Sequence, residues 1–455
     1  MPHAEPDTTR SPWVAALSVA ALHTALRLWI ILGPGMSGPG ASDEHHFHLP
    51  VIRTFAEQWP RPDLSDYLAA STPGYHLAMV GVASLTGGEL TPMRLVSGTV
   101  VTLMLAVLAW FAARRIGTLG AMALCVPLMA SAYLLGASTL LLPEGAAWTL
   151  LVLLLLLALQ PRIVWRTYAL GGLLVLLTVL TRQIFLWSAG LLWLAAWLGS
   201  ETDRSTPSEI LPARESWGIR RRLPRALMAF GATLPAIGAI GVFVWLWRGL
   251  TPPLFHAGAD TEMELAGTHT GVNPSVVLLT LALLGAGGLF FAGFLARPLR
   301  EAWSGRRGLL LRAVSIGAGG AMLLALMLPS SFSREGGRYS GLWNVIARAP
   351  APMDRSPIML VLAPLGGVCL AALWVCLPRR AGWMLTGAVA GFALAQSANH
   401  QAWQRYVEPM VLVTLLLGAA LVWQPRPDRP PRWASAGPVA LGALLALVSL
   451  SRVAG

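Results

Sequence analysis

The sequence has few charged residues. Only 12% of its 455 residues are charged, about half of the roughly 25% that is typical of a soluble globular domain. Hydrophobic residues make up 55% of the chain, and its mean hydropathy is +0.62. Uncharged apolar runs of about 20 residues, the length needed to cross a bilayer, recur along it. This composition excludes a soluble domain and predicts an all-α, multi-pass integral membrane protein.

Lysine is absent from the chain. All 33 basic residues are arginine, and against 21 acidic residues they leave a formal net charge of +12. Such a charge is compatible with nucleic-acid binding, but the arginines form no basic arm and no nucleic-acid motif accompanies them. Most of them lie in short linkers between apolar runs, which is typical of the cytoplasmic loops of membrane proteins. We therefore expect no nucleic-acid partner, and we attribute the missing lysine to genome composition.

Cysteine is scarce as well. The three cysteines, Cys125, Cys369 and Cys376, all fall inside apolar runs. Cys369 and Cys376 are separated by about 10 Å along a helix that rises 1.5 Å per residue, which is too far for an undistorted disulfide. The sequence therefore predicts neither a disulfide framework nor a thiolate metal site.

The apolar runs predict about thirteen transmembrane helices in a single membrane domain that covers residues 1–455. The run 75–88 is too short to cross comfortably and is expected to lie at the interface. The arginine clusters, including that of a 200–225 loop, then fall on one side, which the positive-inside rule assigns to the cytoplasm together with the N-terminus. The predicted spans are 12–33, 92–113, 117–137, 144–160, 167–183, 184–199, 226–247, 273–296, 309–330, 357–377, 381–398, 407–424 and 434–452.

The opposite, external side receives the polar loops. The first loop, 34–91, follows the first span, and the further external loops are 248–272, 331–356 and 399–406. Seven of the nine histidines lie in these loops, as do most of the acidic residues outside the 200–225 loop. Because so little of the chain is polar, this gathering on one face predicts that the functional site lies there.

Four short stretches of the chain resemble the GT-C superfamily of polyprenyl-phosphate-dependent glycosyltransferases. The stretch DEHHFHLP at 43–50 is similar to the family pattern D-E-x-F-H-x-P, with one extra residue after the acids. It is followed by STPGYH at 71–76, which resembles T-x-P-P-G-x-Y without its second proline. Later, RQIFLW at 182–187 resembles R-Q-T-N-I-x-W, and RYVEP at 405–409 resembles R-Y-x-x-x-P. The first loop is similar to that of the dolichyl-phosphate-glucose α-1,2-glucosyltransferase of N-glycan assembly, and Tyr-Val-Glu-Pro endings also recur in bacterial relatives.

The resemblance implies a GT-C-like bundle with interfacial helices in its first external loop. It implies a glycosyltransferase that moves a hexose or pentose from a polyprenyl-monophosphate donor. The acceptor would be a glycan, a lipid or a protein on the external face of the cell (inner) membrane. No cofactor is expected.

Glycosyl transfer needs a base for the acceptor hydroxyl, with a pKa near the working pH. Asp43 and Glu44 are the candidates, because two adjacent carboxyl groups beside an apolar wall tend to titrate apart. The competing interpretation is structural: Ser42 or Asp43 caps a helix that begins near His45. One residue is able to fill both roles, and the sequence does not decide which acid is the base.

The reaction also needs positive groups at the departing phosphate, a task suited to arginine. Arg182 and Arg405 are the candidates, since an arginine so near hydrocarbon must be paired or face water. Each also has a simpler interpretation. Arg182 would pair with Asp43 or Glu44, and Arg405 would pair with Glu408, three residues further on.

Glu144 follows Pro143 at the start of a predicted span. An acid in a first helical turn is favoured by the helix dipole, and the alternative is a second acid that points into the active-site cavity. Together with the resemblance, these considerations predict that donor phosphate or sugar is contacted by Arg182, Gln183, Arg405, Tyr406, Arg338, His48 and Glu144.

The histidines of the first loop suggest a weaker possibility. His45 and His48 would share a helix face, and Glu44 and His48 form an i, i+4 pair. Such a group is able to bind a divalent metal, although no fixed ligand spacing supports it. A sugar contact is the alternative for His48.

Two other functions compete with the monophosphate-dependent transferase. A glycan ligase that uses a lipid-pyrophosphate donor would employ the arginines of the 331–356 loop equally well. A transporter would place ionisable residues near the bilayer midplane and repeat its helices in paired halves. The span interiors are almost uncharged and no internal repeat is visible, which disfavours transport.

Overall fold

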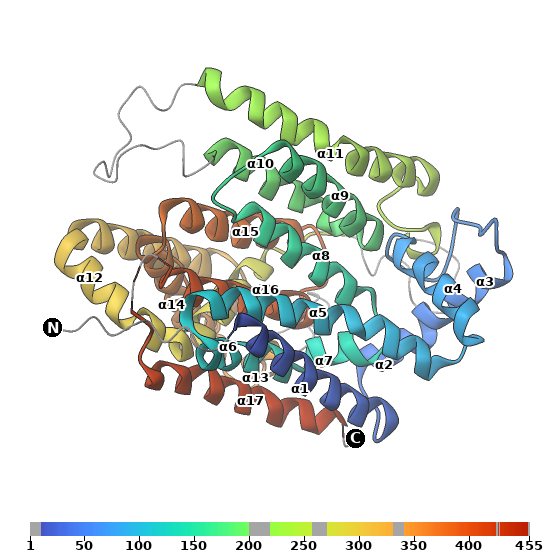
Figure 1. The fold of residues 1–455 in the computed structure, drawn as a ribbon, viewed down its shortest axis with the longest axis horizontal. Coiled ribbons are helices and arrows are strands. Elements are labelled where there is room, and N and C mark those ends of the chain that lie inside the picture. Colours follow the sequence, from blue (N-terminus) through green and yellow to red (C-terminus); the bar gives the residue numbers. More distant parts are fainter. Residues whose placement is uncertain are drawn as a thin grey trace.

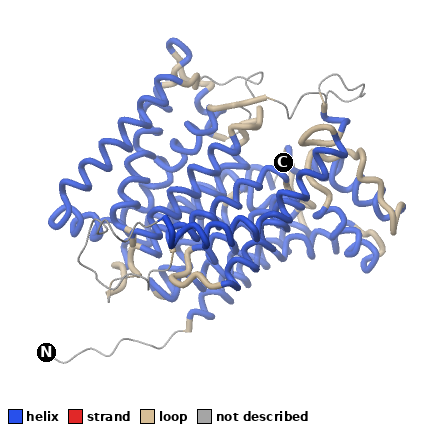
Figure 2. The backbone as a smooth tube through the Cα atoms, turned by 90° about the horizontal axis from the view of Figure 1, so that it is seen from above, coloured by secondary structure: helices blue, strands red, loops and turns tan. Residues whose placement is uncertain are grey.

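The structure is a computed structural model, and it describes residues 11–199, 219–256, 271–330, 341–424, 426 and 428–453. Every regular element among these residues is a helix (Figures 1 and 2). Seven helices are long and apolar enough to cross a membrane, or eight when the bent pair α6 and α7 counts as one span. The chain is therefore a multi-pass membrane protein of the predicted all-α class.

The long helices are α1 (Pro12–Leu32), α5 (Leu90–Ile116), α11 (Ile219–Trp247), α12 (Ser275–Met327), α14 (Pro357–Cys376), α16 (Gln404–Leu421) and α17 (Ala436–Val453). Shorter helices of the bundle are α6 (Thr118–Ala130), α7 (Ala132–Thr139), α8 (Pro143–Ala158), α9 (Trp165–Thr181), η2 (Gln183–Ser188), α10 (Ala189–Leu198) and α15 (Arg379–Gln396). The remaining short elements are η4 (Pro253–Phe255), α13 (Leu342–Ile346), η5 (Pro352–Asp354) and η6 (Arg432–Ser435). Each predicted span contains a helix.

Two predicted boundaries differ from the structure. The run 117–137, predicted as one span, is broken at Ser131, and α6 and α7 diverge by 75°. Ser131 has extended backbone angles and caps α7 through the Leu134 amide. Its hydroxyl also donates to the carboxylate of Glu408 in α16 at 2.6 Å. The break is thus held by a tertiary hydrogen bond, which hydropathy does not reveal.

The second difference concerns the arginine-rich segment between the predicted spans 273–296 and 309–330. It is helical and belongs to α12, whose helical geometry is interrupted at Arg306 (φ −139°, ψ 33°). Both limbs of α12 pack on α14, because Gly285 and Gly317 each lie against its backbone around Gly366 and Gly367. Two limbs that contact the same short stretch of one neighbour must fold back on each other.

The first loop, 34–91, which is predicted to be external, is a folded cap at one end of the bundle. It contains α2 (Pro39–Asp43), the π-type turn η1 (Glu44–His48), α3 (Leu49–Glu57) and α4 (Gly74–Thr86), and Figure 1 shows α2, α3 and α4 together, away from α12. The cap has its own apolar cluster, built around Ile52 and Phe55 and joined to α11 by Trp247. At 13 residues, α4 is too short to cross a bilayer, as expected for the 75–88 run.

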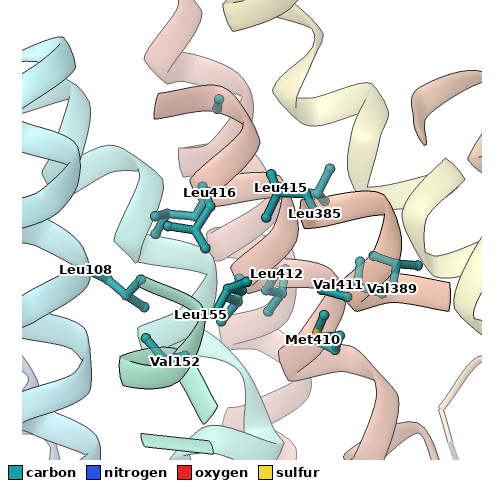
Figure 3. Packing of buried hydrophobic residues seen from close by; sticks show 14 of the residues in the cluster. Leu108, Val152, Leu155, Leu385, Val389, Met410, Val411, Leu412, Leu415 and Leu416 are labelled. Carbon is teal, nitrogen blue, oxygen red and sulfur yellow. The ribbon is translucent and has the colours of Figure 1, made fainter. Parts of the chain in front are cut away.

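Helix α16 lies at the centre of the bundle, with 94% of its residues buried. Figure 3 shows its side chains meeting those of α5, α8 and α15, among them Leu412, Leu108, Leu155 and Leu385. The first turn of α16 carries the RYVEP stretch. The bundle therefore holds Arg405 and Tyr406 at a fixed position beneath the cap.

Candidate active site

The two adjacent acids of the first loop occupy different environments. Successive residues of a helix point about 100° apart, so the continuous turn of α2 and η1 directs Asp43 and Glu44 to different neighbours. The Glu44 side chain is fully buried. Its carboxylate accepts hydrogen bonds from Arg94 in α5 and, at 2.7 Å, from the backbone N–H of Leu141. Glu44 therefore anchors the cap to the bundle.

Asp43 faces a cavity and is 22% exposed. Its Oδ2 atom forms an ion pair with the guanidinium of Arg405, while Oδ1 has no hydrogen bond within the described residues. Burial raises the pKa of Asp43, and the neighbouring Arg405 offsets part of that rise. Neither Ser42 nor Asp43 caps the following turn, because α2 and η1 form one uninterrupted helical stretch. The predicted capping role is therefore wrong.

Arg405 is held by aromatic rings as well as by Asp43. Its guanidinium lies over Trp403 and Tyr406, at 4.4 and 4.9 Å from their ring centroids, and it donates to the Tyr406 hydroxyl at 2.8 Å. Its Nε atom is buried without a hydrogen-bond partner among the described residues. The predicted pair with Glu408 is wrong: both carboxylate oxygens of Glu408 are occupied, by Ser131 and by Gln404.

A second ion pair also lies beside Tyr406. Arg182, at the end of α9, donates to Glu144 at 2.7 Å and lies over the Tyr406 ring at 4.7 Å. The predicted pairing of Arg182 with Asp43 or Glu44 is therefore wrong. Glu144 is in the first turn of α8, and its Oε2 atom is buried without a partner in the described part of the chain. Glu144 therefore lies in a first helical turn, as one interpretation predicted, and its role as a second active-site acid stays a prediction.

The two ion pairs border two cavities that share a wall. The first, which we call the polar cavity, contains about 730 Å³ of empty space and is partly open to solvent. The second, the apolar cavity, contains about 610 Å³. Glu144, Trp403 and Arg405 line both of them. The polar cavity is also lined by Asp43, Phe47, His48, Ala69, Ala70, Ser71, Pro143, Arg182, Phe255, Gln401 and Tyr406.

The apolar cavity is bounded mainly by hydrocarbon. Its lining includes Leu140, Leu142 and Trp148, with one further cation, Arg452, at the end of α17. The guanidinium of Arg452 lies over the ring of Tyr133 at 4.9 Å from its centroid. The lining therefore combines hydrocarbon with two guanidinium groups, those of Arg405 and Arg452.

Gln183 lines neither cavity. Its amide nitrogen donates to the carbonyls of Ala70 and Leu250, both at 2.9 Å, and its oxygen accepts from the Thr72 amide at 3.1 Å. These bonds join the cap, η2 and the segment after α11. Gln183 therefore supports the wall of the polar cavity, and contact with the donor stays a prediction.

The histidines of the first loop also occupy different environments. His45 and His46 are exposed, and His46 bonds back to Ser42. His48 lines the polar cavity and pairs with His76 rather than with His45. Within the described part of the chain, no group of three His, Cys, Asp or Glu side chains is close enough to share a metal ion.

Some predicted features lie outside the described residues. These are Arg338, the segments 257–270 and 331–340 of two loops predicted to be external, and residues 200–218 of the 200–225 loop.

The structure also adds site residues that sequence reasoning missed. Ser71 and Arg452 line the cavities, and the hydroxyl of Ser71 is buried without a partner among the described residues. Arg94 holds Glu44. A signal was available for the two arginines, since each lies at the end of an apolar run, where a charge requires a partner or water. Ser71 lies in the STPGYH stretch, but nothing in the sequence indicates that its hydroxyl faces a cavity.

No protein-family model matches the chain, and no curated protein matches its sequence. Two crystal structures of ArnT from Cupriavidus metallidurans are similar to it. The structure bound to undecaprenyl phosphate is 16% identical, with coverage of 95% of this chain and 79% of that chain and a TM-score of 0.39. The apo structure is also 16% identical, with coverage of 95% and 77% and a TM-score of 0.38.

Proposed function

We propose that the chain is a glycosyltransferase that moves a sugar from a polyprenyl-monophosphate donor to an acceptor hydroxyl, with Asp43 as the base. One observation carries the proposal. A carboxylate with a free oxygen lines a polar cavity, and its counter-ion Arg405 also lines an adjoining apolar cavity. Buried polar atoms without partners, at Ser71, Glu144 and Arg405, surround the same space. Such atoms are rare unless a ligand or water satisfies them.

The two cavities suit the two substrates. The apolar cavity suits the polyprenyl chain, with the phosphate at Arg405 and Arg452, because arginine forms strong charge-assisted hydrogen bonds with phosphate. The polar cavity suits the acceptor, whose hydroxyl would face Asp43. The sugar then lies at the shared wall, within reach of both.

Arg405 links proton transfer to Asp43 with the negative charge that develops on the departing phosphate. The acceptor oxygen attacks the anomeric carbon of the sugar, and its proton moves to Asp43. The bond from the anomeric carbon to the phosphate oxygen breaks, and its electron pair stays on that oxygen, so the lipid phosphate gains one negative charge. Protonated Asp43 no longer requires Arg405 as a counter-ion, and the guanidinium is then available to stabilise the new charge.

Burial adapts Asp43 to this role. A carboxylate with an ordinary aspartate pKa of about 3.9 is a weak base at neutral pH. Because burial raises the pKa of Asp43, its affinity for the proton increases toward the range that suits general-base catalysis. Glu44 is not suited to it, since its oxygens are occupied by Arg94 and Leu141.

The second ion pair, Glu144 with Arg182, would hold a positive charge in position and would not itself react. Glu144 holds Arg182 against the Tyr406 ring, beside the site of charge development. Arg182 then adds a fixed positive charge without the cost of reorganisation during the reaction. The positive-inside distribution of arginine supports a site on the external face of the membrane, with the N-terminus in the cytoplasm.

A lipid-pyrophosphate-dependent ligase is the second candidate. Arg452 favours it, because a second guanidinium in the apolar cavity is well placed for a second phosphate. The two candidates differ in the donor that they accept.

Purified protein in proteoliposomes should be assayed with radiolabelled lipid monophosphate sugars, both hexoses and pentoses, and with the matching diphosphates. We expect transfer from a monophosphate donor that Asp43→Asn abolishes. The matched control is Glu57→Gln, which changes an exposed acid of the same cap. Transfer only from diphosphate donors would favour the ligase, and full activity in Asp43→Asn would reject Asp43 as the base.

A further inference from the structure

The polar cavity contains a histidine that is supported by a second histidine behind it. The Nδ1 atom of His48 lies 3.0 Å from the Nε2 atom of His76, and the two rings stack with centroids 5.2 Å apart. His48 has no other hydrogen bond within the described residues, and its Nε2 atom is accessible rather than buried. The far edge of the His48 ring is therefore the edge that a substrate meets.

His76 is fully enclosed by aromatic rings. Tyr75, Phe55 and Tyr67 surround it, with ring centroids at 5.6, 6.5 and 6.4 Å. Both tyrosine hydroxyls bond elsewhere: Tyr67 donates to the carbonyl of Ser71, and the hydroxyl of Tyr75 pairs with Ser97. The Nδ1 atom of His76 has no partner in the described part of the chain.

Burial keeps both rings neutral. It lowers the pKa of His48 to about 3 and that of His76 well below its ordinary value. Each neutral ring carries one N–H, and a contact of 3.0 Å between two nitrogens requires one hydrogen between them. The geometry therefore allows two tautomer arrangements, which differ in the direction of this hydrogen bond.

The environment of His76 separates the two arrangements. If His48 donated through Nδ1, His76 would carry its proton on Nδ1, as a buried N–H without an acceptor. Buried N–H groups without partners are rarer than acceptors left unpaired. If His76 donates through Nε2, only a lone pair is left unpartnered. The second arrangement is the more stable one.

From this geometry we infer that His76 is a positioning residue for His48. The Nε2–H of His76 fixes Nδ1 of His48 as an acceptor, so that His48 presents its Nε2–H to the polar cavity as a hydrogen-bond donor. The ligand group that it recognises is an oxygen with free lone pairs, either a sugar hydroxyl or a phosphate oxygen. This role rests on the proposed function. It also leaves Asp43 rather than His48 as the proton acceptor.

Nitrogen NMR tests the tautomer without any substrate. The full-length protein, labelled with ¹⁵N-histidine and held in detergent micelles, is compared with His48→Gln and His76→Gln to assign the two rings. We expect the proton on Nε2 in both histidines. A proton on Nδ1 of His48 would overturn the inference, and this result does not depend on whether the protein is a transferase.

A double-mutant cycle tests the positioning role. His76→Phe keeps an aromatic ring but removes the donor, and we expect it to lower kcat/KM by about tenfold, the effect of one lost hydrogen bond. In His48→Gln the amide supplies its own N–H, so His76→Phe should then have little further effect. His76→Gln, which retains a donor, should recover most of the activity.

Equal losses from His76→Phe in both backgrounds would show a merely structural histidine and overturn the inference. Should His76→Phe not fold, the resonances of the unmodified protein still decide the tautomer. If no lipid-phosphate sugar is a donor for any variant, the proposed function fails while the tautomer is still measured.

Discussion

Removal of Glu44 should destabilise the protein more than removal of Asp43 does. Glu44→Ala leaves Arg94 without its carboxylate and the Leu141 N–H without its acceptor. Breaking a buried ion pair costs about 3–5 kcal/mol. The Arg94 side chain retains 16% exposure, so water relieves part of this cost and we expect a loss of about 3 kcal/mol. Asp43→Ala should cost about 1–2 kcal/mol, because Asp43 is more exposed and Arg405 keeps its aromatic contacts.

Thermal unfolding of the purified variants in detergent, followed by tryptophan fluorescence, measures this difference. The Tm of Glu44→Ala should fall well below that of the unmodified protein, while the Tm of Asp43→Ala should stay close to it. Activity per folded molecule should show the reverse order. If Glu44→Ala melted normally and lost activity as completely as Asp43→Ala, the anchoring role of Glu44 would be refuted.

Three further predictions concern the site. The transfer rate should rise with pH, because only deprotonated Asp43 is active as a base. The apparent pKa of this rise should lie above the ordinary aspartate value, because burial raises the pKa of Asp43. A pH–rate profile without such a rise would contradict this. Arg182→Ala should lower kcat about 100-fold, as expected for loss of a preorganised positive group, and wild-type kinetics would contradict its role. Arg452→Ala should raise KM for the lipid donor about tenfold with little change in kcat. Arg348→Ala, which changes an exposed arginine and is the control, should leave KM unchanged. Equal effects of the two variants on KM would contradict a phosphate contact by Arg452.

Local properties of the sequence were sufficient to predict the helices and the interfacial helix of the cap. A run of about 20 apolar residues must form a helix in a bilayer, so the spans follow from composition. The 13-residue α4 was recognised by its length. The break at Ser131 was not predictable, because its partner Glu408 is 277 residues away and lies inside another helix.

Several members of the candidate site were predicted from the sequence, but their pairing was not. Asp43, Arg182 and Arg405 stood out as charges beside apolar runs. The ion pair of Asp43 with Arg405 spans 362 residues, and it depends on how the cap sits over α16. Proximity in the sequence instead favoured an ion pair between Arg405 and Glu408. That prediction was wrong because the carboxylate of Glu408 accepts hydrogen bonds from Gln404 and Ser131. The different environments of Asp43 and Glu44 likewise depend on tertiary structure, because they are set by which faces of the continuous helical turn of α2 and η1 meet Arg405 and Arg94.

A single-turnover measurement tests the central claim most directly. The protein is first loaded with a radiolabelled polyprenyl-phosphate sugar, and the rate of sugar release to the acceptor is followed for the unmodified chain, Asp43→Asn and Glu44→Gln. We predict that Asp43→Asn binds the donor and transfers its sugar at least about 100-fold more slowly, while folded Glu44→Gln transfers at nearly the normal rate. Normal transfer by Asp43→Asn, or selective loss in Glu44→Gln, would contradict the assignment of Asp43 as the base.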